Sequence, residues 1–329
     1  QLGTEGVRRK ELGPATPGKA VRGLMIELAA ERVMLMRMAQ AALMPDPHYL
    51  DAPPPGMMQL CHRESVVQFI NDVCEDFGLM TQTAGLAVTY FDRFLSATGG
   101  SLAKNRVQIV ALTCTLLAAK FSEIKMPSLD DLVEVAHGLF TKAQLKETEL
   151  ETLRVLHWEL HAVTPHAALE QLALLTNHTD EQSKTFIEHA EFFIDMSYFM
   201  YEMLKFPPLV VASSALLCAW VHLGNAKAID EHMHELCCLC GVAQHELLPC
   251  KTILLEHFNT TYPKAAEAAE RHRAANAQRL AAAGRSSPDS VMDCHAPNVS
   301  IKEPPSPVAV PDVPMGDADA PEYSFYPVQ

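Results

Sequence analysis

Residues 86–123 read LAVTYFDRFLSATGGSLAKNRVQIVALTCTLLAAKFSE, and this stretch decides the fold. It predicts two helices, 81–96 and 103–122, because the Gly99-Gly100 pair between them is typical of a helix end followed by a loop. The second helix is apolar on most of its faces, which is typical of a helix buried at the centre of a domain. The sequence therefore predicts an all-α domain with 103–122 as its central helix.

The flanking sequence extends this pattern into two similar units. Segments 62–77, 128–137 and 142–158 have helical periodicity and complete a five-helix unit. A second apolar helix follows Pro207-Pro208 and predicts a second unit of the same plan. We divide the chain into a mobile arm (1–19), an N-terminal helix with a Pro-rich connector (20–58), two helical domains (59–161 and 162–263), and an Ala-rich helix followed by a disordered, acidic, Pro-rich tail (264–329).

Composition excludes several classes of function. The 329 residues include 26 Lys and Arg against 40 Asp and Glu, a formal net charge of −14, which argues against a nucleic-acid partner. No apolar run has the roughly 18 to 20 residues that span a bilayer, so we expect no membrane partner. Nine cysteines without a regular spacing indicate reduced thiols and a protein of the nucleus and cytoplasm. No Gly-rich phosphate loop or catalytic motif occurs, so we expect neither enzymatic activity nor a cofactor.

Six segments in the same order carry a resemblance to one family. They are ERVMLMRM (31–38), HRESVVQFINDVCED (62–76), LAVTYFDRFLS (86–96), LLAAKFSEI (116–124), LRVLHWELHAVTPHAALEQL (153–172) and KFPPLVVASSAL (205–216). Together they resemble the cyclin family, and are most similar to the D-type (G1) cyclins. The resemblance implies two tandem five-helix cyclin folds with an extra N-terminal helix. It also implies a regulatory subunit of a cyclin-dependent protein kinase that acts in G1 or G1/S control.

The resemblance also assigns roles to particular residues. Lys120 in AAKF and Glu149 in ETELETL match the family's kinase contacts, while Asp92 and Arg93 match a structural motif that is packed and hydrogen-bonded within the domain. The family's substrate-docking groove would be formed by His62, Ser65, Phe69, Asp72, Val107 and Gln108.

This sequence departs from the family pattern in the groove. His62 and Ser65 replace large apolar residues and Phe69 replaces a tryptophan, which reduces the apolar floor for Arg-x-Leu peptides. The Leu-x-Cys-x-Glu motif that D-type cyclins use to bind retinoblastoma-type proteins is not seen.

Two other functions are also considered from features of the sequence. A cyclin-fold transcription factor of the general-initiation type is the alternative function, and its need for a basic face is poorly met here. A metal-dependent helical enzyme would use the histidines and cysteines between 232 and 250. We interpret these as helix packing, with no metal bound, because no Cys-x₂-Cys pair faces a second one. The cluster consists of His232, His234, Cys237, Cys238, Cys240, His245 and Cys250.

Regulation by phosphorylation is predicted outside the two domains. Thr16, Ser287 and Ser306 each precede a proline, as proline-directed kinases require, and all three fall in segments predicted to be disordered. Phosphorylation adds charge and acceptor oxygens. The tail, 285–329, is therefore predicted to bind a ubiquitin ligase that controls turnover.

Overall fold

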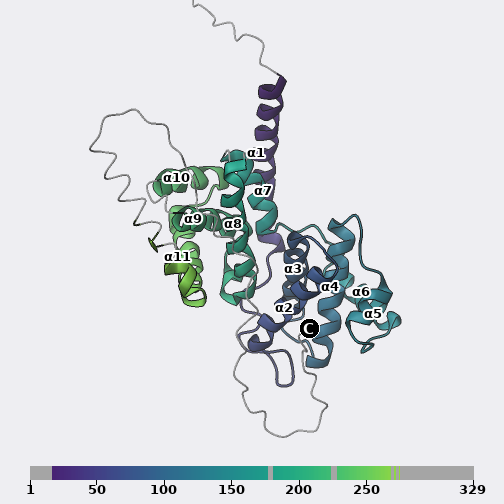
Figure 1. The fold of residues 1–329 in the computed structure, drawn as a ribbon. Coiled ribbons are helices and arrows are strands. Elements are labelled where there is room, and N and C mark those ends of the chain that lie inside the picture. The colour runs from purple at the N-terminus through teal and green to yellow at the C-terminus, as the bar shows by residue number, and fades with distance from the viewer. Residues whose placement is uncertain (1–16, 177–180, 224–227, 268–269, 272–273, 275–329) are drawn as a thin grey trace, which may run out of the picture.

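The structure is a computed structural model that describes residues 17–176, 181–223, 228–267, 270–271 and 274 (Figure 1). Within these ranges the regular secondary structure is helical, and the β-type pairing is a single isolated bridge between Met57 and Ala103. None of the described helices combines the length and the apolar character needed to cross a membrane. The all-α prediction is confirmed. The predicted arm up to residue 16 and the tail from 275 lie outside the described residues.

The first domain is built around the central helix α4 (Val107–Ser122). Every residue from Ile109 to Ala119 is buried, so this helix has no solvent-facing side along that length. The prediction of a central helix is confirmed, although its first residues, Lys104–Arg106, form a 3₁₀ turn instead. Three helices pack against α4, namely α2 (Leu60–Asp76), α3 (Thr81–Ala97) and α6 (Lys142–Val155), and α5 (Leu129–Val135) packs against α6.

The second domain repeats this arrangement around α9 (Pro208–His222). Its residues from Leu209 to Trp220 are buried, as the apolar sequence after Pro207-Pro208 predicts. Thr164 caps the first helix by accepting a hydrogen bond from the backbone N–H of Ala167. The surrounding helices are α7 (Pro165–Leu175), α8 (Glu181–Phe199), α10 (Ala228–Cys240) and α11 (Gln244–Thr261), with a 3₁₀ turn at Tyr201–Lys205.

The N-terminal helix α1 (Pro17–Leu43) packs against the second domain, on α7 and α10. Its buried residues, Ala29 and Val33, lie four positions apart and so share one face. Figure 1 shows the N-terminal part of α1 extending past the second domain. The helix begins at Pro17 rather than after residue 19, because proline at the first helical position costs no hydrogen bond.

Candidate functional site

Lys120 and Glu149 meet at an edge of the first domain. Lys120 lies in the last turn of α4 and Glu149 in the middle of α6, and these two helices pack together. The Lys120 Nζ donates a hydrogen bond to the Glu149 Oε1 over 2.5 Å. The side chains are 37% and 16% exposed, so solvent or a partner can reach the pair. The bond uses one of three ammonium donors, which leaves both side chains with capacity for further hydrogen bonds.

Exposed apolar side chains lie on the same two elements. Phe121 directly follows Lys120, Ile124 lies just after the end of α4, and Leu150 directly follows Glu149. All three are exposed, and Ile124 is 107% exposed, which means that it has no packing contact to lose. Met126 and Trp158, also exposed, extend this set toward α5 and toward the end of α6. Large apolar side chains grouped at a surface are typical of a protein-binding site.

Trp158 is held outward by an unusual backbone turn. His157 and Trp158 have φ angles of 55° and 61°, in the left-handed region that bulky residues rarely occupy. The Trp158 N–H donates to the Leu153 carbonyl over 2.8 Å, which closes the end of α6 and compensates part of the strain. The indole remains 64% exposed. A strained turn that presents an exposed tryptophan is a feature expected of a binding site.

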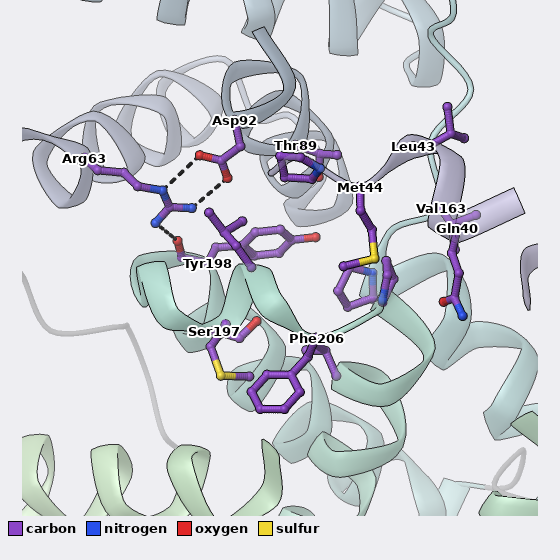
Figure 2. Close-up of a pocket in the computed structure, with 16 residues that line it drawn as sticks. Gln40, Leu43, Met44, Arg63, Thr89, Asp92, Val163, Ser197, Tyr198 and Phe206 are labelled. Atoms are coloured by element: carbon purple, nitrogen blue, oxygen red, sulfur yellow. Dashed lines mark hydrogen bonds and ion pairs between the residues drawn. The ribbon is translucent and has the colours of Figure 1, made fainter. Parts of the chain in front are cut away.

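A second ion pair is buried at the junction of the two domains (Figure 2). The Arg63 guanidinium donates to both carboxylate oxygens of Asp92, from Nε over 2.9 Å and from Nη2 over 2.7 Å. The Tyr49 hydroxyl donates to the same carboxylate over 2.6 Å. Burial opposes the charge on Arg63, but the Asp92 carboxylate outweighs it and raises the pKa of the guanidinium. Burial, reinforced by the Asp92 charge, also raises the pKa of Tyr49 well above its ordinary value.

Arg63 also connects the first domain to the second. Its Nη1 donates to the Tyr198 carbonyl over 2.8 Å, at the end of α8 (Figure 2). That carbonyl has no partner within its own helix, and a cation is favoured at a helix C-terminus, so Arg63 acts as a cap from another domain. A second link runs from the Leu50 N–H to the Tyr201 hydroxyl over 2.8 Å. A cavity of about 80 Å³ lies beside this junction, between α1, α3 and the second domain.

Asp92 and Arg93 do not bind each other. Asp92 points inward to Arg63, whereas Arg93 is half-buried and donates to the Glu159 carbonyl over 2.9 Å, after α6. Burial lowers the pKa of Arg93. The sequence interpretation missed Arg63, although a signal exists. Arg63 is in phase with the buried positions Val66, Val67 and Ile70 of α2, and an arginine on an apolar face requires a buried partner.

The predicted groove residues gather on α2 and at the start of α4, with different exposures. Val107 is buried, so it could form only the floor of a groove, and its assignment stays a prediction. The His62 ring caps α2 by accepting the Gln59 N–H over 3.0 Å, and burial lowers its pKa. Asp72 accepts a hydrogen bond from Gln68 over 2.6 Å. Ser65 is exposed, while Phe69 and Gln108 are half-buried.

The histidines and cysteines of 232–250 do not gather into a single cluster in the structure. Within the part of the chain that the structure describes, no three His, Cys, Asp or Glu side chains are placed to hold a metal ion. The His232 ring stacks on Trp220 at 3.9 Å, and Cys240 is buried against Ser213. His234 and Cys238 share an exposed face of α10, 3.8 Å apart. The predicted phosphorylation sites Thr16, Ser287 and Ser306 lie outside the described residues.

Comparison with known proteins identifies the class of protein. A family model described as "Cyclin, N-terminal domain" matches residues 31–161, and one described as "Cyclin, C-terminal domain" matches 163–286. The chain belongs to the cyclin family. Its fold is similar to that of a viral cyclin from herpesvirus saimiri, with a TM-score of 0.57 at 17% identity over 70% of this chain and 99% of that one.

Similar sequences are A-type and G2/mitotic cyclins. Cyclin-A1-3 of Oryza sativa subsp. japonica is 29% identical over 50% of this chain and 33% of its own length. G2/mitotic-specific cyclin-2 of Medicago sativa is 28% identical over 59% and 56%. Cyclin-A1 of Carassius auratus is 34% identical over 45% and 37%. The chain thus spans between a third and just over half of these relatives, and they do not support the D-type placement.

Proposed function

We propose that this cyclin is a non-catalytic regulatory subunit that activates a cyclin-dependent protein kinase. The observation that carries the proposal is the Lys120–Glu149 pair, which lies at an accessible edge beside exposed apolar side chains. An ion pair of this kind supplies donors and acceptors that fix the orientation of a partner. The apolar side chains around it supply the area that excludes water.

The physical basis of activation is differential binding. A protein kinase is active when its movable helix is turned inward and the helix's glutamate pairs with the lysine that holds the ATP phosphates. A rigid surface that fits this inward position better than the outward one shifts the population toward it. The first domain has the required rigidity, because α4 is buried along its length and carries Lys120 at its end.

The phase of the cell cycle in which this cyclin acts is a separate proposal. We place this cyclin in G1 or G1/S control on the strength of its D-type-like motifs, although the names of the similar sequences point to other phases. Measuring the level of the protein through a synchronised cell cycle tests this timing. A peak confined to mitosis contradicts it.

Localisation and turnover are further proposals. We place the protein in both nucleus and cytoplasm, which imaging of the tagged chain tests. We also propose that residues 285–329 bind a ubiquitin ligase once Ser287 or Ser306 is phosphorylated. Deleting this tail then lengthens the cellular half-life, and an unchanged half-life contradicts a role in turnover.

The central test reverses the charges of the pair. The Lys120→Glu, Glu149→Lys double variant keeps an ion pair within the domain, so the fold is retained, but it presents each charge at the wrong place to a kinase. Affinity purification of the tagged full chain from cell extract, with the kinase identified by mass spectrometry, then yields no kinase.

A matched control exists in the same domain. Lys142 and Asp130 form an exposed ion pair between α6 and α5, and neither residue belongs to the proposed contact set. Exchanging these two charges leaves kinase recovery unchanged. Equal kinase recovery from the Lys120/Glu149 exchange and the wild-type chain contradicts the proposal.

Truncation of Trp158 or Ile124 to alanine is expected to weaken kinase binding by about 1 to 2 kcal/mol, or roughly fivefold to thirtyfold.

A further inference from the structure

Helix α1 carries a second apolar face that is not packed against the protein. Its inner face, with Ala29 and Val33, is buried against the second domain. Six other large apolar side chains on the same helix are exposed, and Met38 is 69% exposed. They are Leu24, Met25, Leu28, Met34, Leu35 and Met38. So many exposed apolar side chains on one helix indicate an interaction surface.

The exposed side chains follow the spacing of a coiled coil. Positions 24, 28, 31, 35, 38 and 42 alternate steps of four and three residues, which keeps them on one narrow stripe. This stripe lies roughly opposite the buried face of the helix. We name it the outer seam, and it consists of Leu24, Leu28, Glu31, Leu35, Met38 and Ala42. All six are exposed, and five of them are apolar.

The one charged residue of the outer seam selects the geometry of a partner. A second copy paired in parallel would place Glu31 against the same residue of its partner, at the centre of the interface. An antiparallel copy, with its two-fold axis near Val33, instead places Glu31 beside Leu35 of the other copy. It also brings Glu31 of each copy close to Arg32 of the other, so that opposite charges alternate around the axis. The same register pairs Leu28 with Met38.

We propose that the outer seam of α1 is a homodimer interface in which a second copy of the chain binds antiparallel. The seam is about 27 Å long, from 18 steps of 1.5 Å. Because α1 is already held as a helix by the second domain, association does not have to order it first. The N-terminal part of α1 extends past the second domain (Figure 1). This inference does not depend on kinase binding.

The first test measures self-association directly. Sedimentation equilibrium of the full chain over a concentration series is expected to show monomers and dimers in exchange. Leu28→Glu buries a carboxylate in the seam and is expected to weaken the dimer at least about tenfold. Ala30→Glu adds the same charge at an exposed position of α1 outside the seam and leaves association unchanged. Circular dichroism of both variants checks that the helical content is retained.

The second test uses the charges around the axis. Glu31→Arg places four cations near the two-fold axis, at positions 31 and 32 of both copies, and is expected to dissociate the dimer. Adding Arg32→Glu in the same chain restores opposite charges in the antiparallel register, and with them the dimer. In a parallel pair the second substitution does not restore the dimer, because identical residues still face each other.

Two results of the first test overturn the proposal. One is a wild-type chain that stays monomeric into the high micromolar range, and the other is equal weakening of the dimer by Leu28→Glu and Ala30→Glu. If the wild-type chain is monomeric and Leu28→Glu lowers the amount of kinase that co-purifies with it, the seam is a kinase contact. That result also overturns the homodimer proposal.

Discussion

Replacing Arg63 with methionine removes a buried cation while keeping most of the side-chain volume. Three hydrogen bonds of 2.7–2.9 Å are lost, two to Asp92 and one to the Tyr198 carbonyl. The Asp92 side chain is 3% exposed, so it stays largely shielded from bulk water once the guanidinium is removed. The carboxylate then keeps one donor among these contacts, the Tyr49 hydroxyl. The last carbonyls of α8 lose the cap that holds them to the first domain.

The expected cost follows from these contacts. Breaking a buried ion pair by removing one partner costs about 3 to 5 kcal/mol, because a charge stays buried without compensation. The unsatisfied Tyr198 carbonyl adds about 1 kcal/mol. The total, about 4 to 6 kcal/mol, is a large part of the stability of an ordinary domain. At about 2 to 4 °C per kcal/mol, Tm falls by about 8 to 24 °C.

The assay is a double-mutant cycle followed by thermal unfolding. Arg63→Met with Asp92→Leu removes both charges, and we expect the double variant to lose less stability than Arg63→Met alone. Arg106→Met is the control, since its partner Glu151 is similarly half-exposed and such pairs contribute about 0 to 1 kcal/mol. The reasoning is refuted if Arg63→Met lowers Tm no more than Arg106→Met, or if the two single costs simply add in the double variant.

Three further predictions concern packing and protonation. Leu116→Ala, in the buried helix α4, lowers the unfolding free energy by about 2 to 5 kcal/mol, whereas the exposed Leu150→Ala changes it little in the same denaturant titration. Gly85→Ala places a methyl group 2.5 Å from the Tyr198 hydroxyl and is destabilising by about 1 to 3 kcal/mol. Gly23→Ala, with open space around it, is neutral or slightly stabilising. Burial raises the pKa of Cys74 and of Cys250 to about 12, so the stability that their protonated thiols contribute below about pH 9 is lost as pH rises toward 12. Unfolding titrations across this range check the loss, and a stability constant from pH 8 to 11 contradicts it.

The fold was predictable because its strongest signals are local. Two helices without a polar face had to be central, and α4 and α9 are the centres of their domains. Serine and threonine are favoured at N-caps, and Ser128 and Thr141 each accept a hydrogen bond from the backbone N–H three residues later. Such features depend on neighbours in the sequence, which the sequence shows directly.

The missed features depend on contacts between distant residues. Asp92 was expected to be packed, but its partner lies 29 positions earlier, on another helix. The periodicity of α2 places Arg63 on the buried face without showing which carboxylate it binds. Hydrophobicity alone does not distinguish an exposed Ile124 from a buried Leu116, since the distinction arises only when the helices are packed. The outward position of Trp158 depends on two left-handed backbone angles that its sequence does not favour.

Arg63–Asp92 and Lys120–Glu149, two of the ion pairs of the first domain, differ in burial, and burial decides what each can do. Arg63 and Asp92 are buried and satisfy each other, so their interaction energy is already used to hold the domains together. Lys120 and Glu149 are partly exposed and retain hydrogen-bonding capacity, so their interaction with each other contributes little to folding, and they remain available to a partner. Substitutions at the first pair are therefore expected to lower Tm and to affect kinase recovery only through loss of folded protein. Charge exchange at the second is expected to leave Tm nearly unchanged and to abolish recovery. Measuring both quantities on both sets of variants separates a structural role from a binding role.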